Sequence, residues 1–453
     1  MKDKQARRKF LKGLGVTGSV FSLAPMTMDN LWTPNIQSKS NTSKPNFVTS
    51  YNKTIDEARE VALDILKPSK RDLEHGLELH RASIVFDTYG FMPRSAYDGD
   101  AIAQLVNSGA SLLEINNMKE DHSMTRMVSN AIEYQEVKLG WEASGVTCVF
   151  QNTGEESNTI KVLLKRLARF MHVTDSIPKL VQKALTVEDI RLAKSEGRHA
   201  LCFSGNGVPM ALDMTSLEEE LEYIRIFYQL GIRMMHLTYN RRNLIGDGCG
   251  ETSDGGLSDF GRAVVKRMNE QGVIVDIAHS GWQTSLEAAQ LSTKPMVASH
   301  TTATSLKHHI RSKPDNVIRA IADTDGYVGI CSIPRFLGGK GDISVMLDHI
   351  DYVAKKFGPQ YVGIGTDVPY SSSNFSVENA KIPKYRGART RWEALWPEDP
   401  FKETHRMRQS MLWTNWPLFT VGLVQRGYSD DDIQKMIGGN ALRVLSANSQ
   451  AKV

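Results

Sequence analysis

Residues 272–300, GVIVDIAHSGWQTSLEAAQLSTKPMVASH, decide the fold that we expect for this chain. They contain two short apolar runs, Val273–Ile277 and Pro295–Ser299, and a histidine closely follows each run, His279 and His300. Such runs are typical of strands buried on both faces of a parallel sheet, and the segment between them has the pattern of a helix. The stretch therefore predicts a strand–helix–strand unit with an imidazole just past the end of each strand.

The same alternation of apolar runs and helical patterns continues on both sides of this unit. The nine candidate strands are 83–88, 110–115, 145–150, 199–203, 232–238, 273–277, 295–299, 326–332 and 361–366. The helical patterns lie at about 122–140, 156–170, 186–196, 216–230, 258–271, 283–291, 314–323 and 345–356. This alternation predicts an α/β protein with one (β/α)8 barrel of the TIM type, in which one candidate is an extra strand or no strand. A doubly wound open sheet is the alternative fold.

The composition is that of a globular protein with a large core. The 453 residues are 41% hydrophobic and 23% charged, which leaves ample apolar material for a barrel of this size. A helical pattern from about Ile55 to Leu79 precedes the candidate strands, and another from Asp430 to Leu445 follows them. We expect a single barrel domain over residues 54–446, with an N-terminal helical extension, a C-terminal helical cap and a tail at 447–453.

The first 24 residues have the pattern of an export signal. Arg7 and Arg8, followed by Phe10, resemble the twin-arginine motif, and a moderately apolar run comes next. We expect residues 1–24 to be the signal, residues 25–53 to be a polar linker, and the protein to be periplasmic or otherwise extracytoplasmic. The signal carries six basic residues and one acidic residue against a net charge of +4 for the chain. The rest is therefore nearly neutral and does not indicate nucleic-acid binding, and no run has the length of a membrane span.

The two histidines point to chemistry because of where a barrel would place them. Active sites of parallel barrels are built at the C-terminal ends of the strands. Neutral imidazole is a good zinc ligand, so His279 and His300 in successive units predict a metal or catalytic site. The alternative is that each is a hydrogen-bonded histidine at a strand end with no further role.

Several segments resemble the membrane dipeptidase family, over roughly residues 80 to 446. The segments are HLTYN (236–240), GGLSDFGRAVV (255–265), DIAHSG (276–281), ASHTTA (298–303), HHIRSKPD (308–315), VGIGTDVPY (362–370) and GYSDDDIQKMIGGNALRVL (427–445). The resemblance implies a metal-dependent (β/α)8 barrel of the amidohydrolase type. Members of that family hydrolyse dipeptides with two bridged zinc ions.

Four residues match functional positions of the family. The resemblance implies that His279 and His300 are the two histidines of the second zinc. It also implies that Asp367 handles the proton of the attacking water and of the leaving amine. Arg311 matches the arginine that holds the substrate carboxylate, a task suited to the two parallel hydrogen bonds of a guanidinium.

Other positions depart from the family pattern. Where the family has a His-x-Asp pair on the first zinc, this chain has Tyr89 and Phe91. Where the family has a bridging glutamate, the segment offers only Ser204 or Asn206, and Asn206 is the residue that we expect to contact substrate. The family histidine that polarises the substrate is replaced by Tyr239. The first metal site is thus predicted to be absent.

These losses favour one ion over two. We expect zinc or another divalent metal on His279, His300 and Asp367, with a water in the open position. The alternative is a site without metal, in which Asp367 and a histidine form an acid–base pair while Tyr89 and Tyr239 donate to a developing oxyanion. The glycine-rich loop at 240–258 is predicted to lie over the barrel mouth, where Glu251 or Asp254 would supply a lost carboxylate unless the loop is purely structural.

The function that we expect is an exported metal-dependent hydrolase that cleaves the amide bond of a dipeptide or a similar small amide. Its substrate would be a small molecule with a carboxylate held by Arg311. Two alternatives stay open: a lyase or epimerase in the same barrel, and an inactive homologue that only binds a ligand. A homodimer is compatible with the sequence.

Overall fold

The computed structural model describes residues 51–154, 159–213, 215–387 and 396–449. The chain from Phe47 onward forms one compact unit. The expected export signal and most of the expected linker lie outside the described residues, as does the end of the expected tail.

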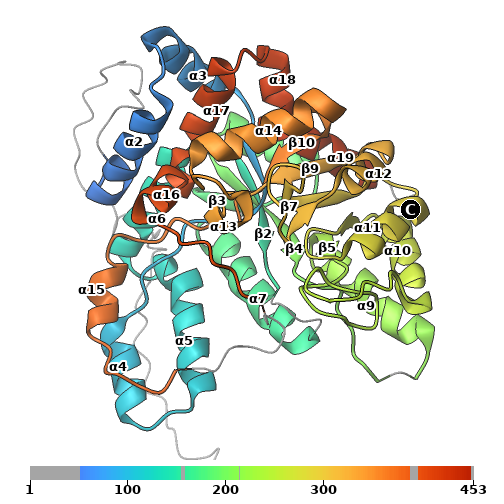
Figure 1. Ribbon diagram of the computed structural model, residues 1–453. Helices are drawn as coiled ribbons and strands as arrows, with labels where there is room; N and C mark the ends of the chain where they lie inside the picture. The colour runs from blue at the N-terminus through green and yellow to red at the C-terminus, as the bar shows by residue number, and fades with distance from the viewer. Residues whose placement is uncertain (1–50, 155–158, 214, 388–395, 450–453) are drawn as a thin grey trace, which may run out of the picture. The chain divides into compact units, whose positions relative to one another are not determined.

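Eight parallel strands follow one another around a nearly closed barrel (Figure 1). In order they are β1 (Phe86–Gly90), β2 (Cys148–Asn152), β4 (His199–Gly205), β5 (Ile232–His236), β6 (Ile274–Asp276), β7 (Val297–Ala303), β9 (Tyr327–Ile330) and β10 (Val362–Ile364). Just after β10, the Asp367 backbone N–H donates to the Tyr89 carbonyl of β1 at 3.0 Å. This contact joins the last strand to the first, so the predicted barrel is confirmed and the open sheet is excluded.

One of the nine predicted strands is wrong. Residues 110–115 run into helix α5 (Leu112–Thr125) instead of a strand. Ser111 begins this helix with a capping box, since its hydroxyl accepts from the Glu114 N–H at 3.3 Å while the Glu114 carboxylate accepts from the Ser111 N–H at 2.7 Å. Leu113 is 69% exposed and Ile115 is the one fully buried residue of this apolar run, so the run lacks the burial on both faces that a barrel strand has. Two short strands that the sequence did not reveal, β3 (Val181–Lys183) and β8 (Ser312–Lys313), pair with β4 and β7.

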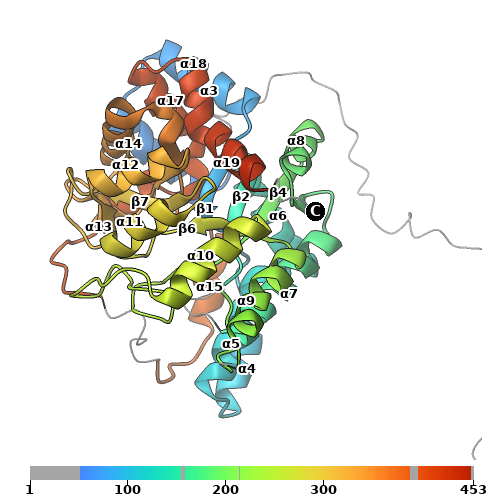
Figure 2. The ribbon, with the colours of Figure 1, turned by 90° about the vertical axis from the view of Figure 1, so that its right-hand side faces the viewer.

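Helices surround the barrel, and most lie where the sequence predicts them. Figure 2 shows α10 between α9 and α11 on one side of the sheet. The helices between the strands are α4 (Gly99–Asn107), α5, α6 (Ala131–Ser144), α7 (Ile160–Ser176), α8 (Val187–Ser195), α9 (Leu217–Gln229), α10 (Asp259–Gln271), α11 (Trp282–Leu291), α12 (Asp315–Asp323), α13 (Pro334–Leu337) and α14 (Ile343–Phe357). Among the described residues, none of the helices is both long and apolar enough to span a bilayer.

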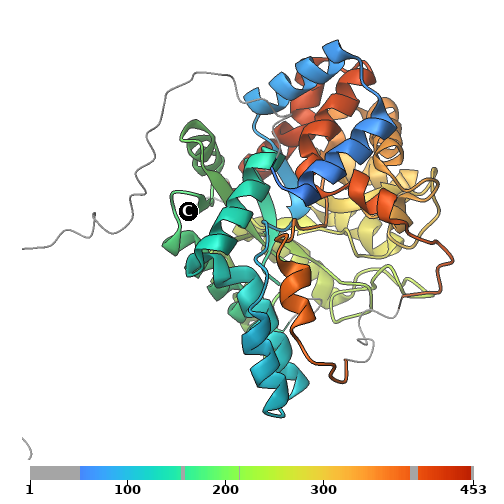
Figure 3. The same cartoon turned by 90° about the vertical axis from the view of Figure 1, so that its left-hand side faces the viewer.

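The N-terminal helices pack against two of the C-terminal helices beside the barrel (Figures 1 and 3). The predicted N-terminal helix is two helices, α2 (Lys53–Leu66) and α3 (Lys70–Ala82), because Lys67 adopts a left-handed conformation and Pro68 follows it. His80 in α3 is fully buried and lies 2.8 Å from the Thr420 hydroxyl of α17. The C-terminal helices are α15 (Phe375–Ala380), α16 (His405–Ser410), α17 (Trp416–Gln425), α18 (Asp430–Gln434) and α19 (Asn440–Ser449), with a π-helical turn at Lys435–Gly439.

Large side chains fill the inside of the barrel below its C-terminal rim. Phe86 of β1 and Phe150 of β2 stack with ring centroids 4.8 Å apart, and both are fully buried. Met234, Ile274 and Tyr327 from later strands belong to the same buried cluster. This filled interior closes the lower part of the barrel, so polar groups at the strand ends face one rim, as in other parallel barrels.

Candidate metal centre at the barrel rim

Three imidazoles meet at the ends of three consecutive strands. His236 ends β5, His279 follows β6, and His300 lies in β7. One ring nitrogen from each of the three lies within 4.8 Å of the others, and the Nε2 atoms of His279 and His300 are 3.0 Å apart. All three side chains are buried. We call these residues the imidazole cluster; it confirms that the folding brings the two predicted histidines together.

The outer nitrogen of each predicted histidine has a polar partner. The Nδ1 atom of His279 lies 2.8 Å from the Asn240 side-chain oxygen, and that of His300 lies 2.8 Å from the Ser299 hydroxyl. Burial, followed by the positive charge of Arg311, holds the pKa of both imidazoles well below the ordinary value of 6.5. Both rings are therefore neutral near pH 7, which is the form that binds a metal.

His236 is the residue of the cluster that the sequence analysis missed. Its Nε2 atom lies 2.9 Å from the Asp276 carboxylate, yet neither ring nitrogen makes a well-aligned hydrogen bond. Burial acts to raise the pKa of Asp276, but His236 and hydrogen bonds from Ser299 outweigh it and keep the carboxyl ionised. The signal for His236 was available: like the other two histidines, it stands at the end of a predicted strand, within HLTYN.

Two tyrosines cover the imidazole cluster. The ring of Tyr89 stacks on His300 with centroids 3.9 Å apart, and the ring of Tyr239 stacks on His279 with centroids 4.1 Å apart. The Tyr89 hydroxyl donates to the Asn206 side-chain oxygen at 3.0 Å. Burial, and then the negative charge of Asp367, raises the pKa of Tyr89 well above 10. Tyr89 is therefore a neutral hydrogen-bond donor near pH 7.

Asp367 lies close by but outside the imidazole cluster. It follows β10 in a left-handed conformation with φ of 57°, and its backbone N–H is bonded to the Tyr89 carbonyl. Its side chain is half-buried. Among the described residues, the groups with mutually close ligand atoms include the three histidines but not Asp367. The structure thus places Asp367 at the rim, where a proton acceptor would be needed, and does not place it among the metal ligands.

Arg311 lies directly behind the cluster. Its guanidinium is fully buried and donates to the backbone carbonyls of Ala278 and His300, the latter at 3.1 Å. The Nε atom has no hydrogen-bond partner within the described residues. Arg311 therefore ties together the two chain segments that carry His279 and His300. These two bonds occupy two of the five N–H donors of the guanidinium.

The region of the missing first metal site is filled. Phe91 packs edge-on against Tyr89, with ring centroids 6.3 Å apart. The nearby carboxylate of Asp87 accepts from the Thr366 hydroxyl at 2.6 Å and from the Trp413 indole at 2.9 Å. Burial, opposed by these hydrogen bonds, raises the pKa of Asp87 to about 6. Asp87 is thus engaged in closing the barrel.

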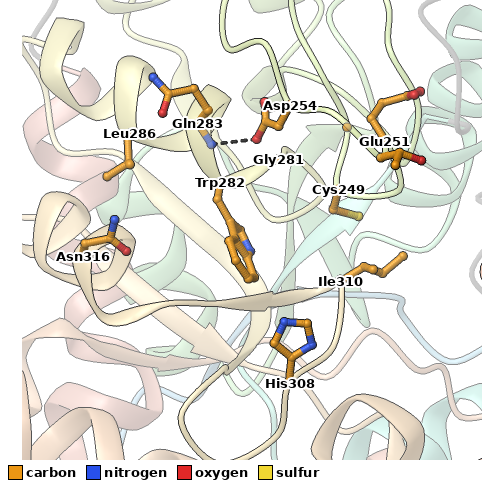
Figure 4. Close-up of a pocket in the computed structure, with 12 residues that line it drawn as sticks. Cys249, Glu251, Asp254, Gly281, Trp282, Gln283, Leu286, His308, Ile310 and Asn316 are labelled. Carbon is orange, nitrogen blue, oxygen red and sulfur yellow. Dashed lines mark hydrogen bonds between the residues drawn. The ribbon is translucent and has the colours of Figure 1, made fainter.

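Two carboxylates of the loop at 240–258 accept hydrogen bonds from nearby backbone N–H groups. Asp254 accepts from the Gln283 N–H at 2.6 Å and thereby caps α11 (Figure 4). Glu251 accepts from the Arg242 N–H at 2.9 Å. These contacts favour the structural interpretation of the loop over the one in which it supplies a lost ligand.

A pocket of about 580 Å³ lies beside the cluster, beneath this loop (Figure 4). Trp282 and His308 form part of its wall, with their rings at 78° to each other. None of the three clustered histidines lines it. Cys249 links the pocket to the imidazole cluster, because its thiol donates at 3.4 Å to the same Asn240 oxygen that contacts His279. The pocket is therefore a neighbour of the cluster.

The residues present fit one metal ion. His236 offers a buried Nδ1 atom that makes no hydrogen bond to a described residue, and the Nε2 atoms of the other two histidines face each other. Imidazole nitrogen is a preferred donor for zinc and its neighbours in the periodic table. A parallel barrel with such a nitrogen-donor centre at its C-terminal rim is typical of metal-dependent barrel enzymes.

Comparison with known proteins places the chain within this class. The sequence model of the membrane dipeptidase family (Peptidase family M19) matches residues 75–382, and the chain belongs to that family. Dipeptidase tcpJ of Claviceps purpurea is 26% identical over 286 residues, which cover 62% of this chain and 57% of the relative. The chain spans about half the length of the curated relatives that it matches.

Solved structures have the same fold. An amidohydrolase from Pseudomonas aeruginosa is 25% identical with a TM-score of 0.58, over 82% of this chain and 98% of that one. A metallopeptidase from Rhodobacter sphaeroides, described as liganded with a phosphinate mimic of the dipeptide L-Ala-D-Ala, is 17% identical with a TM-score of 0.57, over 81% and 99%. These similarities agree with the eight-stranded barrel described above.

Proposed function

We propose that this protein hydrolyses the amide bond of a dipeptide or a similar small amide, with a divalent metal at the imidazole cluster. One observation carries the proposal: a chain of the membrane dipeptidase family brings His279 and His300 to 3.0 Å at the rim. The ligand named for the Rhodobacter sphaeroides structure, a dipeptide mimic, supports the substrate class.

The residues around the imidazole cluster have different roles in the proposed hydrolysis. A bound divalent ion would make water more acidic and polarise the amide carbonyl. Asp367 accepts the proton of the attacking water and returns it to the leaving amine, as a half-buried carboxylate at the rim is able to do. Tyr239, stacked on His279, donates to the oxygen that becomes negative. Tyr89 holds Asn206 in place through its hydroxyl.

Arg311 contributes charge and rigidity in this scheme. Its buried positive charge attracts an anionic substrate toward the rim, because its hydrogen bonds within the described part of the chain go to backbone carbonyls and not to a carboxylate. Its bonds to the Ala278 and His300 carbonyls also fix the spacing of the two histidine segments. The substrate would therefore carry a carboxylate, as dipeptides do.

A dipeptide screen tests the proposal. Full-length protein is stripped of metal, loaded with Zn²⁺ and incubated with a panel of dipeptides that includes D-residues at the C-terminal position; released amino acids are then measured. We expect hydrolysis that stops on chelation, and we expect Asp367→Asn to lower kcat by about 10²- to 10⁴-fold, as for loss of a general base. Hydrolysis that is insensitive to chelation, or no hydrolysis by zinc-loaded protein, would overturn the proposal.

We further propose that the protein reaches an extracytoplasmic compartment by the twin-arginine route. Arg7 and Arg8 support this, together with the apolar run that follows them. The test fuses residues 1–53 to a reporter that is active only after export in a folded state. Replacement of both arginines by lysine should abolish export, and unchanged export of that variant would contradict the proposal.

A further inference from the structure

We infer that this chain binds a single metal ion through three imidazoles, with His236 as a third ligand beside His279 and His300. The inference deepens the proposed function, on which it rests for the presence of a metal. It assigns a ligand that the family resemblance does not supply, because His236 matches none of the family positions considered above. In this inference Asp367 is not a metal ligand, and its role is that of the proton acceptor in the proposed function.

The hydrogen bonds of two of the histidines already direct their Nε2 atoms at a common point. The Asn240 oxygen is an acceptor, so the proton of neutral His279 is on Nδ1 and the lone pair is on Nε2. Ser299 leaves the choice open for His300, because a hydroxyl is able to donate or accept. At 3.0 Å the two Nε2 atoms need either a shared proton or a cation between them.

His236 adds the third nitrogen. Both of its ring nitrogens are buried; Nε2 lies 2.9 Å from the Asp276 carboxylate, whereas Nδ1 has no hydrogen-bond partner among the described residues. A buried polar atom in that state is costly unless something satisfies it. Its ring is edge-on to both other histidines, with centroid distances of 5.4 Å in each case. A metal would take one of its nitrogens and leave the other to Asp276.

Asp276 suits the role of a positioning residue for His236. One of its carboxylate oxygens accepts from the backbone N–H groups of Ala278 and Ser299, at 3.0 Å each. The other oxygen lies 2.9 Å from His236 Nε2. A carboxylate held in this way behind a ligating histidine fixes its orientation and strengthens it as a ligand.

The surroundings favour one ion and a metal that prefers nitrogen. Three neutral imidazoles bring no negative charge, and the buried Arg311 guanidinium adds a positive one behind two of the ligands. A second dication would therefore be poorly compensated. Nitrogen donors favour zinc, copper, nickel or iron over magnesium and calcium, which require oxygen ligands.

Metal titration of the full chain tests the inference. Protein stripped of metal is titrated with Zn²⁺ against a chelating indicator, which gives both stoichiometry and affinity, and Mg²⁺ serves as a competitor. We expect one Zn²⁺ per chain that excess Mg²⁺ does not displace. Loss of the hydrogen-bond partner of a ligand weakens metal binding by up to about 100-fold. We expect His236→Gln, which removes a ligand, to weaken Zn²⁺ binding by more than this.

The matched control is His80→Gln, which changes an equally buried histidine beside α17. Thermal unfolding shows whether each variant is folded, and Co²⁺ loading gives an absorption spectrum that reports the ligands directly. An unchanged Co²⁺ spectrum and Zn²⁺ affinity in folded His236→Gln would overturn the inference, and so would two ions per chain. If one ion binds as described and no dipeptide is cleaved, the proposed function fails while the metal site stands.

Asn240 provides a second, smaller readout of the same arrangement. Asn240→Asp retains an acceptor for His279 Nδ1, whereas Asn240→Leu removes it. We expect Asn240→Leu to weaken Zn²⁺ binding by about 10- to 100-fold and Asn240→Asp to rescue it. Equal Zn²⁺ affinity of the two variants would contradict the assigned role of His279 Nε2.

Discussion

The two halves of the barrel rim have opposite characters. On the side of β5 to β7, three buried imidazoles converge and each has a polar neighbour within 3 Å. On the side of β1 to β4, Tyr89 and Phe91 pack their rings together and Asn206 accepts a hydrogen bond from Tyr89. The family resemblance implies metal ligands on both sides. The difference teaches that one half of such a centre is dispensable for the fold, since the barrel closes here without it.

The filled half closes the barrel by other means. Asp87 receives four hydrogen bonds, from the backbone and hydroxyl of Thr366, from the backbone of Tyr89 and from the Trp413 indole. These bonds join β1, the end of β10 and the C-terminal helices. The carboxylate on this side thus stabilises the structure, whereas Asp276 on the other side orients a candidate ligand.

The largest effect is expected from loss of a histidine on the imidazole side. His300→Ala removes a ligand that is already directed at the common point, so both zinc binding and dipeptide hydrolysis should fall below detection. Tyr89→Ala, on the opposite side of the same stack, serves as the comparison. Zinc titration of both folded variants checks this, and substantial zinc binding by His300→Ala would break the contrast between the halves.

A smaller effect is expected for Asp87→Asn on the filled side. Every side-chain oxygen of Asp87 accepts from an N–H group, so the new amide N–H₂ must face a donor. An unpaired buried donor costs about 1–3 kcal/mol of unfolding free energy. Zinc stoichiometry should stay unchanged. Chemical denaturation measures the free energy of unfolding, and metal titration measures the zinc stoichiometry. A loss of zinc would contradict the purely structural role of Asp87.

The same variant has a pH signature. The pKa of Asp87 rises from its ordinary value of 3.8 to about 6 on folding, so between these values the folded chain holds a proton that the unfolded chain has released. The contribution of this group to stability is therefore full below about pH 4 and is lost as the pH rises through 6. Denaturation midpoints at pH 4 to 7 should lose this slope in Asp87→Asn and retain it in Asp175→Asn, which changes an exposed residue.

The smallest effect is expected from Tyr89→Phe. The substitution keeps the ring that stacks on His300 and removes the hydroxyl that donates to Asn206. Loss of that bond should lower the free energy of unfolding by about 1 kcal/mol, with little change in zinc affinity. A Tyr89→Phe variant that loses zinc would show that the tyrosine is itself a ligand, and the two halves would then form one site.

Much of the fold followed from the sequence because barrel strands are short, apolar and buried on both faces. Eight strands were predicted in this way, whereas 110–115 was wrong because the capping residues Ser111 and Glu114 outweigh a run of which only Ile115 is fully buried. The pairing of His279 with His300 also followed, since each histidine marks the end of its own strand. His236 was not predicted, because the functional residue that the family resemblance implies for this segment is at the position of Tyr239, three residues later.

Other features depend on packing that a sequence pattern does not encode. The bonds of Arg311 to two backbone carbonyls, and those of Asp87 to Thr366 and Trp413, join segments far apart in the chain. The family resemblance implies that the Arg311 guanidinium binds a substrate carboxylate, and the sequence places Asp87 near the barrel mouth. Only the folded arrangement shows that both groups are already engaged.

X-ray absorption at the zinc edge of the loaded full-length protein tests the central claim most directly. The account predicts a ligand shell with three imidazoles and no second metal at the roughly 3.5–4 Å that separates the ions of two-metal sites. A metal–metal signal at that distance, or a shell with two imidazoles and carboxylate oxygens, would contradict it.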